Sequence, residues 1–200
     1  MTTNLIPGKE VHRFQTKSGE EAVTRLPRWE DLPALTEYIN TISQEDTYIT
    51  VFNREISYEE ETTFLSKVFY NIESKKELVL LCFVGETLVA VSTFKKDNDQ
   101  GERDSHVVVF GISVKQEYRN SGIGYTLSST IIKEGMKHIP DTKIIRLNVY
   151  GDNEQAIHLY EKLGFKEYGR LPGGIQFHEK YIDNISMYLE TSKIRNVSFN

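Results

Sequence analysis

The sequence predicts an α/β domain in which helices flank a mixed central sheet. Strand-like and helical segments alternate along the chain, a pattern typical of this class. Of the 200 residues, 38% are hydrophobic, enough for a single core. We therefore expect one domain over residues 1–200, with its core at about 20–190 and flexible ends at 1–9 and 191–200.

The first half of the chain carries hairpin and helix signals. Ser18-Gly19 separates two extended stretches and Gly85-Glu86 separates two apolar ones, so each pair is expected to form antiparallel strands. Ser57 and Glu60 make a capping box, which predicts a helix start. The elements expected here are a hairpin over 11–26, helices over 29–40 and 57–72, and strands over 77–84 and 87–94. Residues 42–56 show no clear periodicity.

The second half alternates strands and helices. Gly111 interrupts a strand rich in β-branched residues, and Gly164 follows a helical pattern as a C-cap would. The elements expected here are strands over 105–114 and 143–149, helices over 123–136 and 153–163, and closing strands over 166–171 and 184–190. Between the closing strands we expect a longer loop, residues 172–182, that overhangs a substrate cleft.

Composition narrows the classes of function. The formal net charge is -5 and no long run of Lys and Arg occurs, which argues against a nucleic-acid partner. No secretory signal or membrane-length apolar segment is visible, so we expect a cytoplasmic protein without a membrane partner. The single cysteine, Cys82, lies in an apolar run and is expected to be a buried structural thiol. His158 and His178 have no partner at metal-ligand spacing, so no metal is expected.

Gly122 and Gly124 lie between the predicted strand and the predicted helix. Such a junction can bind an anion, because the first amides of the helix have no partner within it. Glycines there also serve turn geometry alone. A P-loop needs Lys and Ser/Thr after the second glycine, where Tyr125-Thr126 stands. A Rossmann turn needs a third glycine or alanine, where Leu127 stands.

Two motifs together resemble the GNAT superfamily of acetyl-CoA-dependent N-acetyltransferases. Residues 119–124, RNSGIG, match the pattern Arg/Gln-x-x-Gly-x-Gly/Ala of its pyrophosphate loop. Residues 153–165, NEQAIHLYEKLGF, are similar to its second signature, N-x-x-A-x-x-L/F-Y-x-x-x-G-F. The resemblance covers about Val107–Tyr168 and implies a GNAT-like fold with a splayed cofactor strand.

The resemblance also assigns a binding site for acetyl-CoA. It implies that the backbone of Ile112, Ser113 and Val114 pairs with the pantetheine arm, which an exposed strand edge would allow. It places the pyrophosphate, mostly through N–H groups, on Arg119, Asn120, Ser121, Gly122, Ile123, Gly124 and Tyr125. Asn153 resembles the family's side-chain ligand of the pantetheine arm. Asparagine is also a good helix N-cap, and one residue can do both.

Tyr160 stands where the family carries its general acid. A phenol with a pKa near 10 is protonated at neutral pH and can donate a proton to the leaving thiolate. The alternative is a core tyrosine, because Ala156, Ile157, Tyr160 and Leu163 form one helical stripe.

The general base stays open. Some members of the family carry a carboxylate five residues before the position of Val114, where this chain has Val109. The candidates are a water chain, His106, Glu45 and Asp46.

The acceptor expected from these features is a small amine or a peptide N-terminus. An α-amine, with a pKa near 8, needs less help from a base than a lysine-like amine. Acidic residues at 45–46 and 59–61 would suit a polyamine, although such runs are more often solvated helix starts. A non-catalytic acyl-CoA-binding or sensing domain is the alternative from another class. The resemblance leaves open whether the protein is a monomer or a homodimer.

Overall fold

The computed structural model describes residues 6–45, 54–97, 101 and 103–194. Asp46, one of the candidate bases, lies outside them. The chain divides into two compact units, residues 1–95 with 111–140 and residues 96–110 with 141–200.

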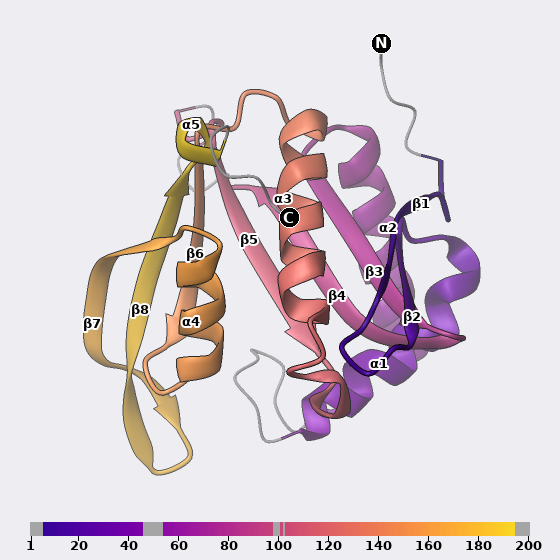
Figure 1. Ribbon diagram of the computed structural model, residues 1–200, viewed down its shortest axis with the longest axis horizontal. Helices are drawn as coiled ribbons and strands as arrows, with labels where there is room; N and C mark the ends of the chain where they lie inside the picture. Colours follow the sequence, from indigo (N-terminus) through magenta and orange to yellow (C-terminus); the bar gives the residue numbers. More distant parts are fainter. Residues whose placement is uncertain (1–5, 46–53, 98–100, 102, 195–200) are drawn as a thin grey trace. The chain divides into compact units, whose positions relative to one another are not determined.

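The elements alternate as the sequence predicts (Figure 1). The first unit contains β1 (Glu10–Gln15), β2 (Glu21–Arg25), a 3-10 turn (Trp29–Asp31), α1 (Leu32–Gln44), α2 (Tyr58–Glu73), β3 (Glu77–Val84), β4 (Thr87–Lys96) up to Lys95, a second 3-10 turn (Gln116–Tyr118) and α3 (Ile123–His138). The second contains β6 (Ile144–Tyr150), α4 (Glu154–Lys162), β7 (Lys166–Phe177), β8 (Lys180–Glu190) and α5 (Thr191–Ile194). The strand β5 (Val107–Val114) contributes to both. The strands form one mixed sheet in the order β1-β2-β3-β4-β5-β6-β8-β7.

Helices cover both faces of the sheet in the first unit. Alternate residues of β3, including Val79 and Leu81, join the apolar faces of α1 and α2 in one buried cluster. On the opposite face, Phe94 of β4 stands beside Leu78 and packs closely on α3. A side chain at Gly135 of α3 would come within 2.5 Å of the Phe94 ring, so the helix can lie that close only with glycine there.

The predicted capping box of α2 is confirmed. The Ser57 hydroxyl accepts the backbone N–H of Glu60 at 3.2 Å, and the Glu60 carboxylate accepts that of Ser57 at 3.0 Å. The hairpins at Ser18-Gly19 and Gly85-Glu86 are also confirmed. Each has a left-handed glycine at its turn, with φ of 87° at Gly19 and 58° at Gly85.

In the second unit, β6 runs parallel to β5 and antiparallel to β8. The β5–β6 register covers Val107↔Ile144 to Val109↔Arg146, whereas β8 pairs along the whole of β6. The strand β5 continues to Val114, five residues past the end of that parallel register.

The prediction of a long loop at residues 172–182 is wrong. The strands β7 and β8 extend through it and pair as far as Phe177↔Lys180, so only a tight turn at His178-Glu179 joins them. Pro172, Gly173 and Gly174 looked like a loop, but the sheet absorbs them as an irregularity in register between Leu171 and Ile175.

Candidate active site

Gly122 makes the turn that starts α3. It is the N-cap of the helix and has φ of 93°, a left-handed conformation that favours glycine. Asn120, two residues earlier, is also left-handed, with φ of 63°. Gly124 is the second residue of the helix, where the backbone N–H groups have no partner within it. Backbone geometry therefore accounts for Gly122, whereas Gly124 leaves the first turn of the helix without a side chain at its second position.

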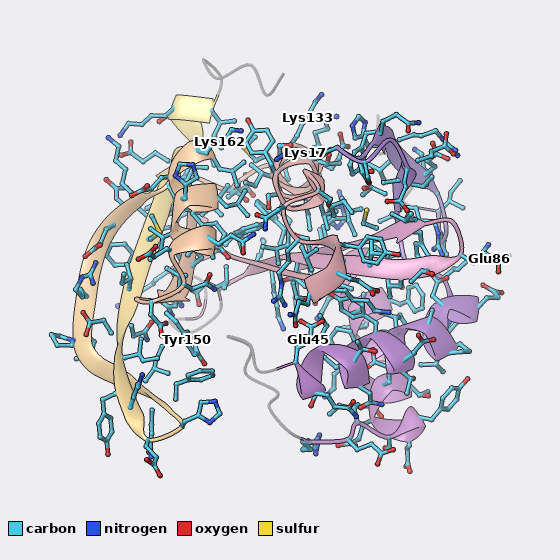
Figure 2. The ribbon with its side chains drawn as sticks, turned by 60° about the horizontal axis from the view of Figure 1, so that its bottom comes forward. Lys17, Glu45, Glu86, Lys133, Tyr150 and Lys162 are labelled. Carbon is cyan, nitrogen blue, oxygen red and sulfur yellow. The ribbon has the colours of Figure 1, made fainter. Side chains whose placement is uncertain are left out.

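An ion pair holds the loop before this turn. The guanidinium of Arg119 pairs with Glu45. Glu45 directly follows the last residue of α1 (Figure 2). It also donates from Nε to the carbonyl of Val114 at 3.1 Å, and its backbone N–H donates to Gln116 at 3.2 Å. Arg119, predicted as a phosphate ligand, is thus engaged within the protein through both its side chain and its amide, and it acts as a brace of the loop.

Glu45 is equally engaged. Its second carboxylate oxygen accepts the backbone N–H of Gln116 at 2.9 Å, and its side chain is 11% exposed. Both oxygens of this carboxylate therefore already accept hydrogen bonds from donors of the protein. This geometry does not favour Glu45 as the general base.

Lys17 is a neighbour of the loop that the sequence does not reveal. The turn between β1 and β2 brings its backbone N–H to the carbonyl of Ser121, at 2.8 Å. Its side chain passes Gly122, where a Cβ would lie 3.8 Å from the Cγ of Lys17 (Figure 2). The hairpin thus adds a cation beside the predicted anion site.

The predicted cofactor strand contacts α1 through Ser113. The Ser113 hydroxyl hydrogen-bonds to that of Tyr38 at 2.8 Å. Tyr38 is buried, which raises the pKa of its phenol. His106 precedes β5 at its opposite end. Ile112 lies six positions further along, about 20 Å of extended chain, so His106 is remote from the segment on which it would have to act as base.

Tyr160 lies in α4 of the second unit among aromatic rings. Its centroid is 6.1 Å from that of Phe110 and 5.9 Å from that of Phe165. Its side chain belongs to the core, with 8% of the residue exposed, and burial raises the pKa of the phenol to about 12. None of the described residues hydrogen-bonds to its hydroxyl. Tyr160 is therefore a core tyrosine, as one interpretation expected, and it keeps a protonated donor at neutral pH.

Asn153 is the N-cap of α4. Its side-chain oxygen accepts the backbone N–H of Ala156 at 3.1 Å. This contact confirms the capping interpretation and leaves its amide group for other partners. The predicted buried thiol is also confirmed, because Cys82 is fully buried and burial raises its pKa to about 11.

A pocket of about 310 Å³ opens in the first unit between α1, α2 and the sheet. Its lining is mostly apolar, with polar groups from Tyr38, Arg54, Glu60, Glu61 and Ser113. The apolar lining residues are Leu35, Ile39, Ile56, Phe64 and Val91. Ser113 links the pocket to the predicted cofactor strand.

Within residues 6–45, 54–97, 101 and 103–194, no three His, Cys, Asp or Glu side chains gather as metal ligands would. None of the helices formed there has both the length and the apolar character needed to span a bilayer.

Comparison with known proteins places these features in context. A model of the acetyltransferase (GNAT) family matches residues 37–165. An N-alpha-acetyltransferase of Sulfurisphaera tokodaii is 42% identical over 65 residues, 32% of this chain and 37% of that protein. The chain thus spans little more than a third of the length of that curated relative.

Solved structures resemble a much larger part of the chain. An acetyltransferase of the GNAT family from Streptococcus pneumoniae superposes with a TM-score of 0.75 at 25% identity, over 84% of this chain and 98% of that one. A spermidine N-acetyltransferase from Vibrio cholerae, solved with CoA and spermine, gives a TM-score of 0.68 at 22% identity, over 88% and 98% of the two chains. At that identity the second likeness concerns the fold alone.

Proposed function

Because this chain belongs to the acetyltransferase (GNAT) family, we propose that it transfers an acetyl group from acetyl-CoA to a primary amine. The observation that carries the proposal is the braced glycine turn at the start of α3. It combines a left-handed Gly122, a first helical turn in which Gly124 carries no side chain, and the nearby Lys17. These groups fit a pyrophosphate, which needs N–H donors and positive charge without side chains in the way.

Each segment then has a separate task. Acetyl-CoA supplies an activated acyl carbon. The amides of residues 120–125 hold its phosphates, and the backbone of Ile112–Val114 pairs with its pantetheine arm as an added strand would. Asn153 contributes its side chain to the same arm. The amides of β5 also orient the thioester carbonyl and stabilise negative charge on its oxygen.

Tyr160 acts as the general acid in this proposal. Expulsion of a thiolate is easier when the sulfur is protonated as the bond to carbon breaks. The phenol of Tyr160 donates that proton and regains one from the acylated nitrogen, so the residue is unchanged after turnover. Its apolar surroundings support the role, because burial keeps the hydroxyl protonated.

The acceptor that fits best is an α-amine of an amino acid or a peptide N-terminus. Part of such an amine is neutral near pH 7, which suits a chain with Val109 in place of a strand carboxylate. The name of the curated relative, an N-alpha-acetyltransferase, points to the same chemistry.

A polyamine is the second candidate acceptor. It is favoured by the fold that this chain shares with the spermidine N-acetyltransferase and by the acidic start of α2. It would need several available carboxylates. Glu60, however, is already bound to the guanidinium of Arg54 and to its own helix cap.

Release of CoA thiol in the presence of a panel of amines tests the proposal. Short peptides with free N-termini are expected to turn over faster than spermidine, and their kcat/KM should change little between low and high salt. A polyamine held by several carboxylates would lose kcat/KM steeply with salt. Acetyl-CoA binding without thiol release for any amine would favour the non-catalytic alternative.

A further inference from the structure

Glu61 is a buried carboxylate in the pocket between α1 and α2. It is 5% exposed and lines the cavity of about 310 Å³. Among the described residues, none forms a hydrogen bond or an ion pair with its carboxylate. An unpaired charge in an apolar pocket is unfavourable for folding, so such a group suggests a function.

Its two neighbours have ordinary structural roles. Glu59 is exposed to solvent, and Glu60 closes the capping box and pairs with Arg54 at 2.6 Å. The helical order of α2 separates them, because Glu61 shares its buried face with Leu65, Val68 and Ile72. The three consecutive carboxylates therefore have different roles. Glu60 and Glu61 both line the cavity, but Glu60 is already bound to Arg54 and to the helix cap.

The other charged or titratable groups of the pocket are accounted for. The guanidinium of Arg54 is bound to Glu60, and the phenol of Tyr38 is bound to Ser113. The groups from β4 and β5 that line the cavity, Val91 and Ser113, carry no charge. A positively charged ligand that enters the pocket would find the carboxylate of Glu61 without a cation of its own.

We propose that Glu61 is the general base, accepting a proton from the ammonium of an acceptor whose neighbouring side chain is apolar. This inference rests on the proposed function. The apolar walls, with Leu35, Ile39 and Phe64, would hold that side chain. Ser113 belongs both to this pocket and to the predicted cofactor strand, so an amine bound there lies next to the strand that orients the thioester.

The proton transfer is balanced within the site. An N–H bond of the ammonium breaks and an O–H bond forms on Glu61, so the lone pair is left on nitrogen to attack the thioester carbonyl. Glu61 then releases its proton to solvent after the product leaves. Burial raises the pKa of Glu61, which brings the carboxylate closer in proton affinity to the amine that it must deprotonate.

Glu61→Gln tests the proposal, with Glu59→Gln as the matched control on the same turn of α2. At pH 7, with a Leu-initiated peptide, Glu61→Gln is expected to lower kcat/KM about 10²-fold. The deficit should shrink as the pH rises past about 8, where the α-amine loses its proton without help. Glu59→Gln should behave like wild type, and an Asp-initiated peptide should be a poorer substrate than the Leu-initiated one.

Thermal unfolding gives a readout independent of activity. Because burial raises the folded-state pKa of Glu61, the wild type loses stability as the pH rises from about 4.5 towards that pKa, and the loss then stays constant. Glu61→Gln removes this loss, so its Tm should be at least that of wild type at pH 7. A lower Tm would show that the carboxylate has a structural partner and would overturn the proposal.

The outcomes separate this inference from the proposed function. If the wild type acetylates peptides and Glu61→Gln does so equally well at pH 7, Glu61 is not the base and the enzyme assignment stands. If the wild type acetylates no amine at all, the proposed function itself fails.

Discussion

The loop Arg119–Gly124 and the pocket around Glu61 differ in whether their charged side chains are paired. In the loop, the guanidinium of Arg119 is paired with Glu45, and the backbone N–H of the hairpin residue Lys17 donates to the carbonyl of Ser121. In the pocket, Glu61 is buried without a charged partner among the described residues. Paired charges give a rigid backbone that can hold a ligand by its amides. An unpaired carboxylate in apolar surroundings is suited to exchange a proton.

Tyr160 belongs with Glu61 in this comparison, because it too is an ionisable group in apolar surroundings. Tyr160→Phe keeps the ring packing and removes only the proton donor. We expect kcat to fall about 10²-fold with acetyl-CoA affinity nearly unchanged. Rapid-quench measurement of the chemical step checks this, and an unchanged rate would mean that the thiolate obtains its proton elsewhere.

Gly124→Val tests the binding side of the comparison. A branched side chain in the first turn of α3 should block the phosphates and weaken acetyl-CoA binding at least tenfold, about 1.4 kcal/mol. Calorimetry measures the affinity, and circular dichroism checks the fold. Gly169→Ala is a suitable control, since its new Cβ would make only an ordinary contact with Ser186 at 3.9 Å. If a folded Gly124→Val variant binds acetyl-CoA as tightly as wild type, the loop does not form the phosphate site.

Glu45→Gln tests whether the brace shapes the loop. The substitution leaves Arg119 without its charged partner, which should lower stability by about 1 kcal/mol and loosen the loop. We expect acetyl-CoA affinity to fall about 5-fold, about 1 kcal/mol by the same conversion. Glu86→Gln, at the exposed β3–β4 turn, should change neither quantity (Figure 2). Unaltered affinity in Glu45→Gln would show that the loop holds its shape without the ion pair.

Lys17→Ala should have the smallest effect. An exposed cation beside a phosphate contributes about 0.5 kcal/mol, so the affinity should fall about 2-fold at low salt and the difference should vanish at high salt. Lys133→Ala is the matched control. That exposed lysine lies ten residues into α3, about 15 Å from the turn. Equal effects of the two substitutions would show that Lys17 acts only through the overall surface charge and not by its place beside the loop.

Local patterns in the sequence predicted much of the fold. The capping box at Ser57, the glycine turns at Gly85 and Gly122, and the N-cap at Asn153 depend on neighbouring residues, so they can be identified from the sequence. The expectation of a long loop at residues 172–182 was wrong for the same reason. Pro172 and the two glycines after it mark a break locally, yet pairing with β8 carries the strand through them.

The candidate site could be predicted only in part, because its supporting contacts join distant residues. Nothing in the sequence pairs Glu45 with Arg119 or brings Lys17 to Ser121. Glu61 is different, since a signal was present. It continues the apolar spacing of Leu65, Val68 and Ile72, and that periodicity predicts that it faces the interior. The acidic run around it suggested a solvated helix start instead. Of the three carboxylates, only Glu59 fits that interpretation fully.

The division between binding and reaction can be tested most directly on two variants measured side by side. Glu45→Gln and Glu61→Gln each change one carboxylate to its amide. Acetyl-CoA affinity by calorimetry and kcat/KM for one peptide, at saturating acetyl-CoA and pH 7, are determined for both. We expect Glu45→Gln to lose affinity with near wild-type turnover, and Glu61→Gln to keep affinity and lose turnover. The reverse pattern, or the same losses in both variants, would contradict the account.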